Sequence, residues 1–385
     1  MLCLYSILSI NNLVSPLTRQ GKTWMRFILL LVSGGGFFFA DDLTTSIERH
    51  QGDSDGYLIM KMEEEEEDTY YYAYAGKKET FDVPEEGDYE LIAVGGRGGS
   101  CNNNSGGYGA QASGTFRLSK GDKLHIAVGG RGVDCNVEVV NFDAGVSETM
   151  YTGAGGAGGT FIELEDGTSE TPKLLLAGGG GGGAGKHFGG EDGEDGPNGG
   201  WDWGGKNGEG GGLSCQDVSS CGLGFALIGG AGGAGHRGDG DSRRGTIPEE
   251  CPKDNKPEEF HPIKFISKDK RDECDRGDLL AEGGKSFQKG GEGGKEQVDH
   301  HGEKEVNSNP QEEVRCRYRY INGGFGGFGG GGEGGIFFGG QWLLDDKYEH
   351  VIRGHTEQFE HGGGGGGGGY SGGGAGQFGG NGGAG

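Results

Sequence analysis

Seven cysteines follow residue 40, and their spacing is the first indication of chemistry in this chain. They are Cys101, Cys135, Cys215, Cys221, Cys251, Cys274 and Cys316. No Cys-x-x-Cys pair occurs, so the spacing indicates neither a zinc ribbon nor a thioredoxin-like motif. Disulfides are the natural interpretation, and pairing of neighbours suggests Cys101–Cys135, Cys215–Cys221 and Cys251–Cys274, although sequence alone does not fix the connectivity. The odd thiol, taken as Cys316, then needs a partner outside this chain.

Two further motifs could carry a modification or a contact. Asn103-Asn104-Ser105 is an N-glycosylation sequon in a Gly/Asn-rich loop, where a glycan would meet no obstacle. Arg-Gly-Asp occurs at Arg237-Gly238-Asp239 and at Arg276-Gly277-Asp278, and the second triplet is a candidate integrin contact. A tripeptide recurs easily in a chain rich in Gly, Asp and Arg, so coincidence is the favoured interpretation of both.

No constellation in the sequence predicts catalysis. Gly180 to Lys186 has the spacing of a phosphate-binding loop, but His187 stands where Ser or Thr should bind magnesium. Residues 190–200 resemble a calcium loop without the spacing of an EF-hand, so we interpret them as a solvated turn. We therefore expect no catalytic residue, no bound cofactor and no metal site.

The charge of the chain restricts its partners. Asp and Glu number 59 against 34 Lys and Arg, which gives a formal net charge of −25. Nucleic acid is excluded as a partner, because the phosphate backbone requires a basic face. An acidic surface favours a basic protein ligand or simply confers solubility. The acidic run Glu63 to Asp68 is interpreted as a solvated spacer, with sulfation of Tyr70, Tyr71 or Tyr72 as the alternative.

Residues 25–40 have the pattern of a secretory signal peptide. Arg26 supplies the positive charge, an apolar stretch runs from Phe27 to Phe39, and Ala40 precedes the cleavage point. This stretch is too short to span a bilayer. The residues before Met25 are mixed polar sequence, which makes Met25 a second candidate initiator. We expect an extracellular protein that carries no membrane span within these residues.

The abundance of glycine needs a structural explanation. The chain contains 94 Gly among 385 residues, and each loses more backbone freedom on folding than any other residue. Collagen is excluded, because Gly does not recur at every third position and only 9 Pro are present. Disorder and a packed glycine lattice remain. Trp201 and Trp203, flanked by glycines, are interpreted as packing anchors, or alternatively as ligand contacts.

A strand pattern repeats before the glycine runs. FDVPEEGDYELIAVGGRGG begins at Phe81, FRLSKGDKLHIAVGGRG begins at Phe116, and a looser copy begins at Phe161. We interpret each as a hairpin whose second strand continues into glycine. Leu124, Ile126 and Val128 share one face, and Phe81 with Val83 and Phe116 with Leu118 do the same, whereas Asp82, Thr115 and Arg117 point outward.

These patterns predict an antiparallel β-sandwich over about residues 70–181. Glycine segments can approach one another to backbone distance, so they are predicted to bundle as polyproline-II-like helices. The mixed charge of residues 236–320 predicts a partly disordered insert.

The order of these blocks resembles the glycine-rich ectodomain of the anaplastic lymphoma kinase and leukocyte tyrosine kinase receptors. The resemblance rests on AVGGRGG, GAQASGTFRLSKGDKLHIAVGGRGVDC, GAGGAGGTFIELEDG and LLLAGGGGGGAG, and later on GGFGGFGGGGEGG and GGGGGGGGYSGGGAGQFGGN. It implies a TNF-like sandwich fused to a bundle of polyglycine helices. It also implies that the domain binds a basic, cytokine-like protein and dimerises with a second receptor copy. No ligand-contacting residue carries over, since that segment of the family lies largely beyond Gly385.

The expected organisation has five segments: 1–40, upstream residues and signal peptide; 41–76, an acidic linker; 77–235, the β-sandwich and glycine module; 236–320, the charged insert; and 321–385, a closing glycine-rich segment. The expected function is the extracellular ligand-binding and scaffold module of a receptor tyrosine kinase-like protein. The alternatives are a secreted glycine-rich matrix or decoy protein without a kinase, and a low-complexity structural protein. The period-two apolar pattern argues against the last of these.

Overall fold

A computed structural model gives the fold of this protein. The residues it describes are 18–19, 22–23, 32–33, 36–37, 55–62, 69–142, 146–200, 203–213, 229–245, 278–295, 302–307, 315–344, 348–350, 362–376, 379–380 and 382–385. They fall into two compact units, residues 1–53 and residues 54–385. In the first unit, β1 (Thr18–Arg19) pairs with β2 (Lys22–Thr23), and β3 (Val32–Ser33) pairs with β4 (Gly36–Phe37). The predicted signal peptide lies mostly outside the described residues.

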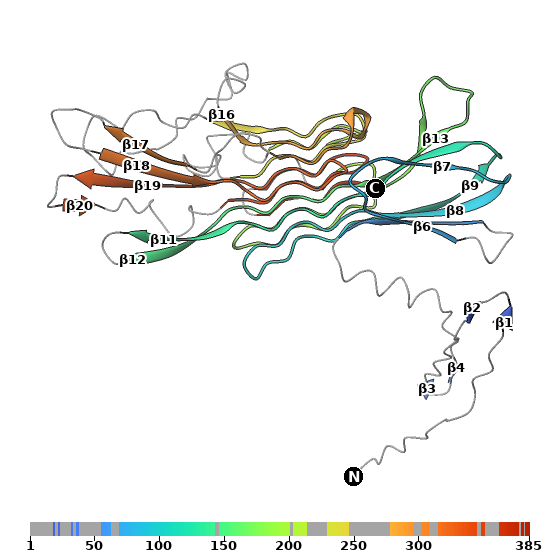
Figure 1. Cartoon of the computed structure of the whole chain (residues 1–385), viewed down its shortest axis with the longest axis horizontal. Helices are drawn as coiled ribbons and strands as arrows, with labels where there is room; N and C mark the ends of the chain where they lie inside the picture. The colour runs from blue at the N-terminus through green and yellow to red at the C-terminus, as the bar shows by residue number, and fades with distance from the viewer. Residues whose placement is uncertain are drawn as a thin grey trace, which may run out of the picture. The chain divides into compact units, whose positions relative to one another are not determined.

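Two four-stranded antiparallel sheets form one end of the second unit (Figure 1). The first sheet has the order β6-β5-β8-β9 and the second β14-β13-β10-β7. Their bounds are β5 Tyr57–Met62, β6 Thr69–Ala73, β7 Glu79–Asp82, β8 Gly87–Val94, β9 Gln111–Leu118, β10 Lys123–Ala127, β13 Thr160–Glu165 and β14 Lys173–Gly178.

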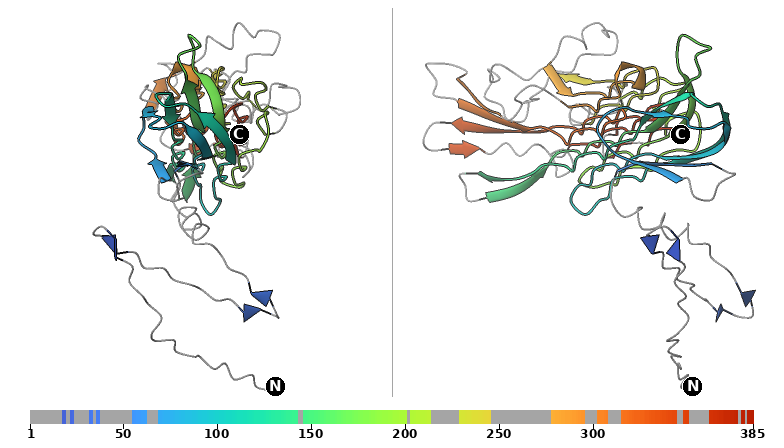
Figure 2. Two further views of the ribbon diagram at one scale, coloured as in Figure 1. Left: turned by 90° about the vertical axis from the view of Figure 1, so that its right-hand side faces the viewer. Right: turned by 45° about the vertical axis from the view of Figure 1, so that its right-hand side comes forward.

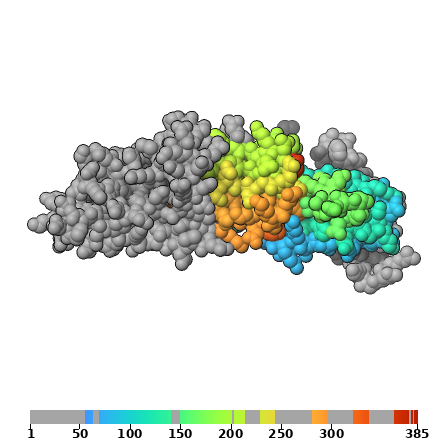
Figure 3. Space-filling model, turned by 90° about the horizontal axis from the view of Figure 1, so that it is seen from above, coloured from blue at the N-terminus to red at the C-terminus, as the bar shows by residue number. Residues whose placement is uncertain are grey.

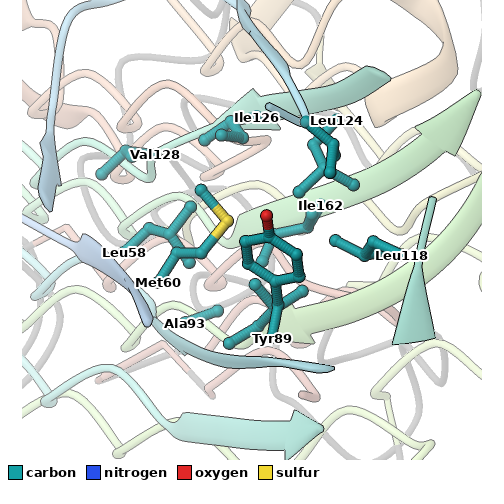
Figure 4. Packing of buried hydrophobic residues seen from close by; sticks show 11 residues of the cluster. Leu58, Met60, Tyr89, Ala93, Leu118, Leu124, Ile126, Val128 and Ile162 are labelled. Carbon is teal, nitrogen blue, oxygen red and sulfur yellow. The ribbon is translucent and has the colours of Figure 1, made fainter. Parts of the chain in front are cut away.

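The two sheets share one hydrophobic core. Leu58 and Met60 of β5 and Tyr89 of β8 come from the first sheet, and Leu124 and Ile126 of β10 from the second (Figure 4). Each of these side chains is at most 1% exposed. The buried Tyr89 hydroxyl donates to the Glu85 carbonyl at 2.9 Å, so its polar end is satisfied. Fully burying one such side chain stabilises the fold by roughly 1.5–3 kcal/mol.

The predicted faces are confirmed, but two of the three predicted hairpins are wrong. Leu124, Ile126 and Val128 are buried, and Thr115 and Arg117 are exposed. However, β7 pairs with β10, whereas β8 pairs with β5 and β9, so the chain crosses between sheets after β7 and again after β9. The first two copies of the repeat are therefore sheet-crossing corners, and of the three predicted hairpins the one formed by β13 and β14 is confirmed. Periodicity identifies the buried face of a strand but not its neighbour.

The two corners are bonded to each other through their backbones. Val83 N–H donates to the Asp122 carbonyl at 2.8 Å, and Gly121 N–H donates to the Val83 carbonyl at 2.9 Å. Gly121 has a φ of +90°, a conformation that glycine adopts at little steric cost. Gly121-Asp122 thus lies in the second corner, whereas Gly87-Asp88 begins strand β8.

The stretch expected to be an acidic linker contributes two strands. β5 pairs with β6 and with β8, which places it inside the first sheet. Tyr70 and Tyr72 of β6 pack against the core, while Tyr71 is 48% exposed. This pair of strands was not predicted, because the acidic run Glu63 to Asp68 falls between them and dominates the composition of the stretch.

Glycine-rich segments fill the middle of the unit, and we call them the glycine array. They are residues 95–99, 105–110, 128–134, 152–159, 178–185, 189–193, 229–235, 323–335 and 362–376. The views of Figure 2 agree that green segments and orange-to-red segments lie side by side. Gly96 N–H donates to Gly158 O and Gly99 N–H to Gly155 O, each at 2.9 Å, so the bonds recur at every third residue.

Close backbone approach is the reason that these segments need glycine. A Cβ added at Gly96 would lie 2.5 Å from the Gly130 carbonyl oxygen and 2.9 Å from its carbon. Alanine occurs where there is room, as at Ala154 and Ala184, both 0% exposed. No polyglycine helix is among the regular elements of the described residues, which are antiparallel strands with one short 3-10 helix, η3 (Phe287–Lys289). The protein is mainly β, as expected.

Further ladders extend from the array. β11 (Val137–Phe142) pairs with β12 (Val146–Tyr151), and β15 (Arg243–Gly245) pairs with β16 (Asp278–Ala281). A third sheet has the order β17-β18-β19-β20, with bounds Gly302–Asn307, Arg315–Ile321, Phe337–Leu344 and Tyr348–His350. Parts of the predicted charged insert are therefore ordered elements, and Gly240 N–H donates to the Gly284 carbonyl, so its yellow and orange parts adjoin on the face drawn in Figure 3.

Candidate functional site

The outer face of the β14-β13-β10-β7 sheet gathers titratable side chains, and we call it the His–Glu face. Leu124 and Ile126 point inward from β10, so His125 between them points outward. On β13, Ile162 points inward and Glu163 outward. His125 and Glu163 are direct partners across the ladder, which places them side by side on this face.

The buried part of this face is a His–Glu pair. His236, which directly follows the array segment 229–235, places Nε2 at 2.8 Å from Glu163 Oε1. The two side chains are only 10% and 11% exposed. The His236 ring stacks on Phe287 of η3, with centroids 5.7 Å apart and an interplanar angle of 19°. Phe287 in turn packs on Phe161 with centroids 4.6 Å apart.

Lys78 completes this cluster. Its Nζ lies 3.6 Å above the Phe287 ring and donates to the Phe287 carbonyl at 2.9 Å. Burial lowers the pKa of Lys78, and the charge of Glu163 acts in the opposite direction. The cluster thus places an amino group, a carboxyl group and an imidazole around two aromatic rings. Its contacts join η3 and the first residue of the insert to the sheet.

The exposed part of the face is a second His–Glu pair. His125 Nε2 lies 2.8 Å from Glu165 Oε2, and His125 Nδ1 lies 3.3 Å from Thr80 Oγ1. The His125 and Glu165 side chains are 26% and 45% exposed. Within the described part of the chain, no three His, Cys, Asp or Glu side chains gather as metal ligands. The face therefore offers ion pairing and hydrogen bonding, and no site on it assembles a nucleophile with its base.

Exposed apolar side chains occur on the bonded segments 128–139 and 323–328 and at Tyr74, whose ring centroid lies 6.3 Å from that of Phe328; we call them the apolar stripe. Gly130 N–H donates to the Phe328 carbonyl at 2.7 Å and Val133 N–H to the Phe325 carbonyl at 2.8 Å, which holds these two segments together. Asp55 and Asp134 flank the stripe, bonded to the Arg131 amide and the Arg131 side chain respectively. The members are Tyr74 (42% exposed), Val133 (49%), Val137 (53%), Val139 (56%) and Phe325 (43%). Grouped exposed apolar residues are typical of a contact surface.

One predicted disulfide is confirmed. Cys101 and Cys135 are bonded, and they link the segments that follow β8 and β10. Cys215, Cys221, Cys251 and Cys274 lie outside the described residues, so their pairing stays a prediction. Cys316 lies in β18 opposite Trp342 of β19, and its bonding partner also stays a prediction.

The sequon lies in a tight turn. Cys101 and Asn104 exchange backbone hydrogen bonds of 2.9 Å in both directions, which leaves Asn102 and Asn103 exposed at the tip. Asn102 has a φ of +57°, which Asn tolerates better than most residues. The predicted glycosylation residue is therefore at the surface.

The other motifs have ordinary structural settings where the structure describes them. Asp239 of the first Arg-Gly-Asp accepts hydrogen bonds from Ser286 N–H and Lys289 Nζ, both at 2.8 Å. Arg276 and Gly277 of the second triplet lie outside the described residues, and Asp278 begins β16. In the loop-like segment Gly180 to Lys186, Gly180 and Gly183 donate to Gly368 and Gly365, so these amides serve the array.

The two tryptophans predicted to be packing anchors are Trp201 and Trp203. Trp201 lies outside the described residues, while the Trp203 carbonyl accepts a hydrogen bond of 2.7 Å from Gly212.

The sequence pattern did not identify His125 or His236 as site residues. The signal for His125 was present, because it alternates with two apolar residues, but nothing in the sequence indicates that His236 reaches Glu163.

Comparison with known proteins adds no assignment: no family model matches the chain, and no curated protein matches it. No helix among the described residues has the length and apolar content that crossing a bilayer requires.

Proposed function

We propose that this chain is the extracellular ligand-binding and scaffold module of a receptor tyrosine kinase-like protein. The observation that carries the proposal is the direct continuation of strands into the glycine array. β8, β10 and β14 each end where residues 95–99, 128–134 and 178–185 begin, and these segments bond to one another. This arrangement supports the resemblance, which rests on the same blocks in the same order.

The proposal extends to the type of sandwich and to the conformation of the glycine segments. We interpret the two sheets as a TNF-like sandwich and the array as a bundle of polyproline-II-like helices. A polyproline-II helix has three residues per turn, which is the period of the bonds that Gly96 and Gly99 donate. Each turn then directs one N–H toward a given neighbour, and a helix without Cβ atoms can have several neighbours.

The proposed ligand is a basic protein. The net charge of −25 favours such a partner electrostatically, and the apolar stripe supplies a contact surface whose rim includes Asp55 and Asp134. A second receptor copy is the other proposed partner. An integrin contact at Arg276-Gly277-Asp278 stays a weaker proposal, because coincidence explains the triplet.

Two measurements test this function. The transcript downstream of the Gly385 codon should encode a membrane span and a tyrosine kinase; a stop codon there would instead support the secreted matrix or decoy alternative. The purified chain should also bind individual small basic secreted proteins of the same organism, and binding should weaken as salt rises. Substitution of Val133 and Phe325 by Ser should also weaken this binding. Equal binding by the variant and the wild type would exclude the apolar stripe as the contact surface.

A further inference from the structure

We propose that Asn103 carries an N-linked glycan that covers the exposed aromatic side chains Tyr108 and Phe188. The inference rests on the proposed extracellular location, because N-glycans are added in the secretory pathway. Asn103-Asn104-Ser105 is the one sequon in the sequence. Asn103 is exposed at the tip of its turn, and Ser105 is exposed as well.

The neighbouring loop places Phe188 beside the sequon. Asn104 Nδ2 donates to the Lys186 carbonyl at 2.6 Å and to the Gly185 carbonyl at 3.3 Å. The Ser105 carbonyl accepts a hydrogen bond of 3.0 Å from Gly190 N–H. The short loop between Lys186 and Gly190 is thus held at both ends by the two residues that follow Asn103. Phe188 lies in the middle of this loop and is 54% exposed.

Tyr108 continues the same edge. Its carbonyl accepts a hydrogen bond of 2.8 Å from Gly193 N–H, and its own N–H donates to Asp192 Oδ1 at 2.7 Å. The ring is 52% exposed and lies 4.4 Å from the Arg97 guanidinium. Residues 104–108 and 186–193 therefore run side by side and expose two large aromatic rings.

A glycan is the cover that fits this edge. Two exposed aromatic rings on neighbouring segments favour association with other surfaces. A carbohydrate is bulky and solubilising, and the hydrophobic faces of sugars stack on aromatic rings. Asn104 and its partners hold the turn in one geometry, so the attachment point of a glycan on Asn103 would be fixed beside the segment that carries Phe188.

The test compares the wild type with Ser105→Ala, which removes the sequon but keeps Asn103, and with Ser105→Thr, which preserves the sequon. Each is expressed in secretory cells in two forms, one with its own first 40 residues and one with a standard secretory leader in their place. Wild type and Ser105→Thr should carry one N-glycan that peptide-N-glycosidase removes, and Ser105→Ala should carry none. In hydroxyl-radical footprinting, oxidation of Tyr108 and Phe188 should rise several-fold in Ser105→Ala, while Phe325 should not change.

The outcomes separate the two ideas. A wild-type chain that reaches the medium in either form without a glycan overturns the modification. A glycosylated chain with the same oxidation at Tyr108 and Phe188 as Ser105→Ala overturns the covering role. Glycosylation and protection seen only with the standard leader would support this inference and contradict the proposed secretion by the chain's own leader.

Discussion

The imidazole Nε2 of His236 lies 2.8 Å from Glu163 Oε1, although the two residues are 73 positions apart in sequence. Glu163 belongs to a strand of the sheet, and His236 stands where the charged insert was expected to begin. The contact is 10–11% exposed, so it is formed inside the molecule rather than on its surface. The start of the insert and the sheet therefore fold together.

Loss of the His236 side chain should destabilise the protein. His236→Ala leaves the buried Glu163 carboxylate with Lys78 as its nearby cation and removes the ring that stacks on Phe287. We expect the free energy of unfolding to fall by roughly 3 kcal/mol, as for other buried pairs that lose one partner. Urea denaturation followed by tryptophan fluorescence measures this.

The matched control is His125→Ala, which breaks the exposed His–Glu pair on the same face. The expected loss there is about 0–1 kcal/mol. Equal losses for the two variants would show that burial of the His236 pair does not contribute to stability.

Alanine in the glycine array should be far more damaging than alanine in a turn. At Gly96 the new methyl would meet the Gly130 carbonyl and would also lie 3.3 Å from the Ala157 Cβ. Overpacking against backbone that cannot yield should lower the free energy of unfolding by about 1–3 kcal/mol or more. Gly196→Ala is the control, because a Cβ there meets nothing within 4 Å, and we expect its effect to stay within about 0.5 kcal/mol. A Gly96→Ala protein that unfolds like the control would contradict a close-packed array.

Part of this fold could be predicted from sequence because apolar alternation is a local signal. Leu124 and Ile126 identify the buried face of β10 without knowledge of the partner strand. The partner depends on where the chain crosses between sheets, and Val83 to Gly87 reads equally well as a hairpin turn or as a corner. β5 was not predicted for another reason: it is a short strand that an acidic run follows in sequence. The charge of that run favoured a linker over a strand.

The candidate site was less predictable than the fold. Cys101 and Cys135 could be paired correctly, because they are neighbours among the cysteines of the sequence. His236 could not be identified, because its function depends on a contact between a glycine segment and β13. Glycine segments have no side-chain pattern that specifies their neighbours, so the arrangement of the array lies beyond local sequence signals.

Removal of the Cys101–Cys135 disulfide should loosen the array where two of its segments meet. The bond closes a loop with a sequence separation of 34, so its loss should lower the free energy of unfolding by about 3–4 kcal/mol in the chain-entropy estimate. Cys101→Ser with Cys135→Ser, unfolded by heat beside the wild type, measures the difference. A double variant with an unchanged melting temperature would show that the surrounding hydrogen bonds suffice.

Peptide mapping should find Cys251 bonded to Cys274. β15 and β16 pair through Gly245 and Asp278, so the chain leaves and returns at adjacent positions. Cys251 follows the first position and Cys274 precedes the second by only a few residues, and a short cross-link across the base of the loop is therefore favoured over a distant partner. Mass spectrometry of non-reduced peptides from the secreted chain decides this, and a Cys251–Cys316 peptide would contradict it.

Alkaline pH should destabilise the protein through the tyrosines of β5 and β6. Burial raises the pKa of Tyr57, and the neighbouring Tyr71 raises it further; burial also raises the pKa of Tyr72. In the unfolded chain a tyrosine loses its proton near its ordinary pKa of about 10. The folded chain keeps that proton to a higher pH, so the folded state binds more protons and stability falls as the pH rises above 10. Urea unfolding between pH 8 and 11, at about half-unit steps, should show this decline, and Tyr57→Phe should make it shallower. An equally steep decline in the variant would assign the effect to other groups.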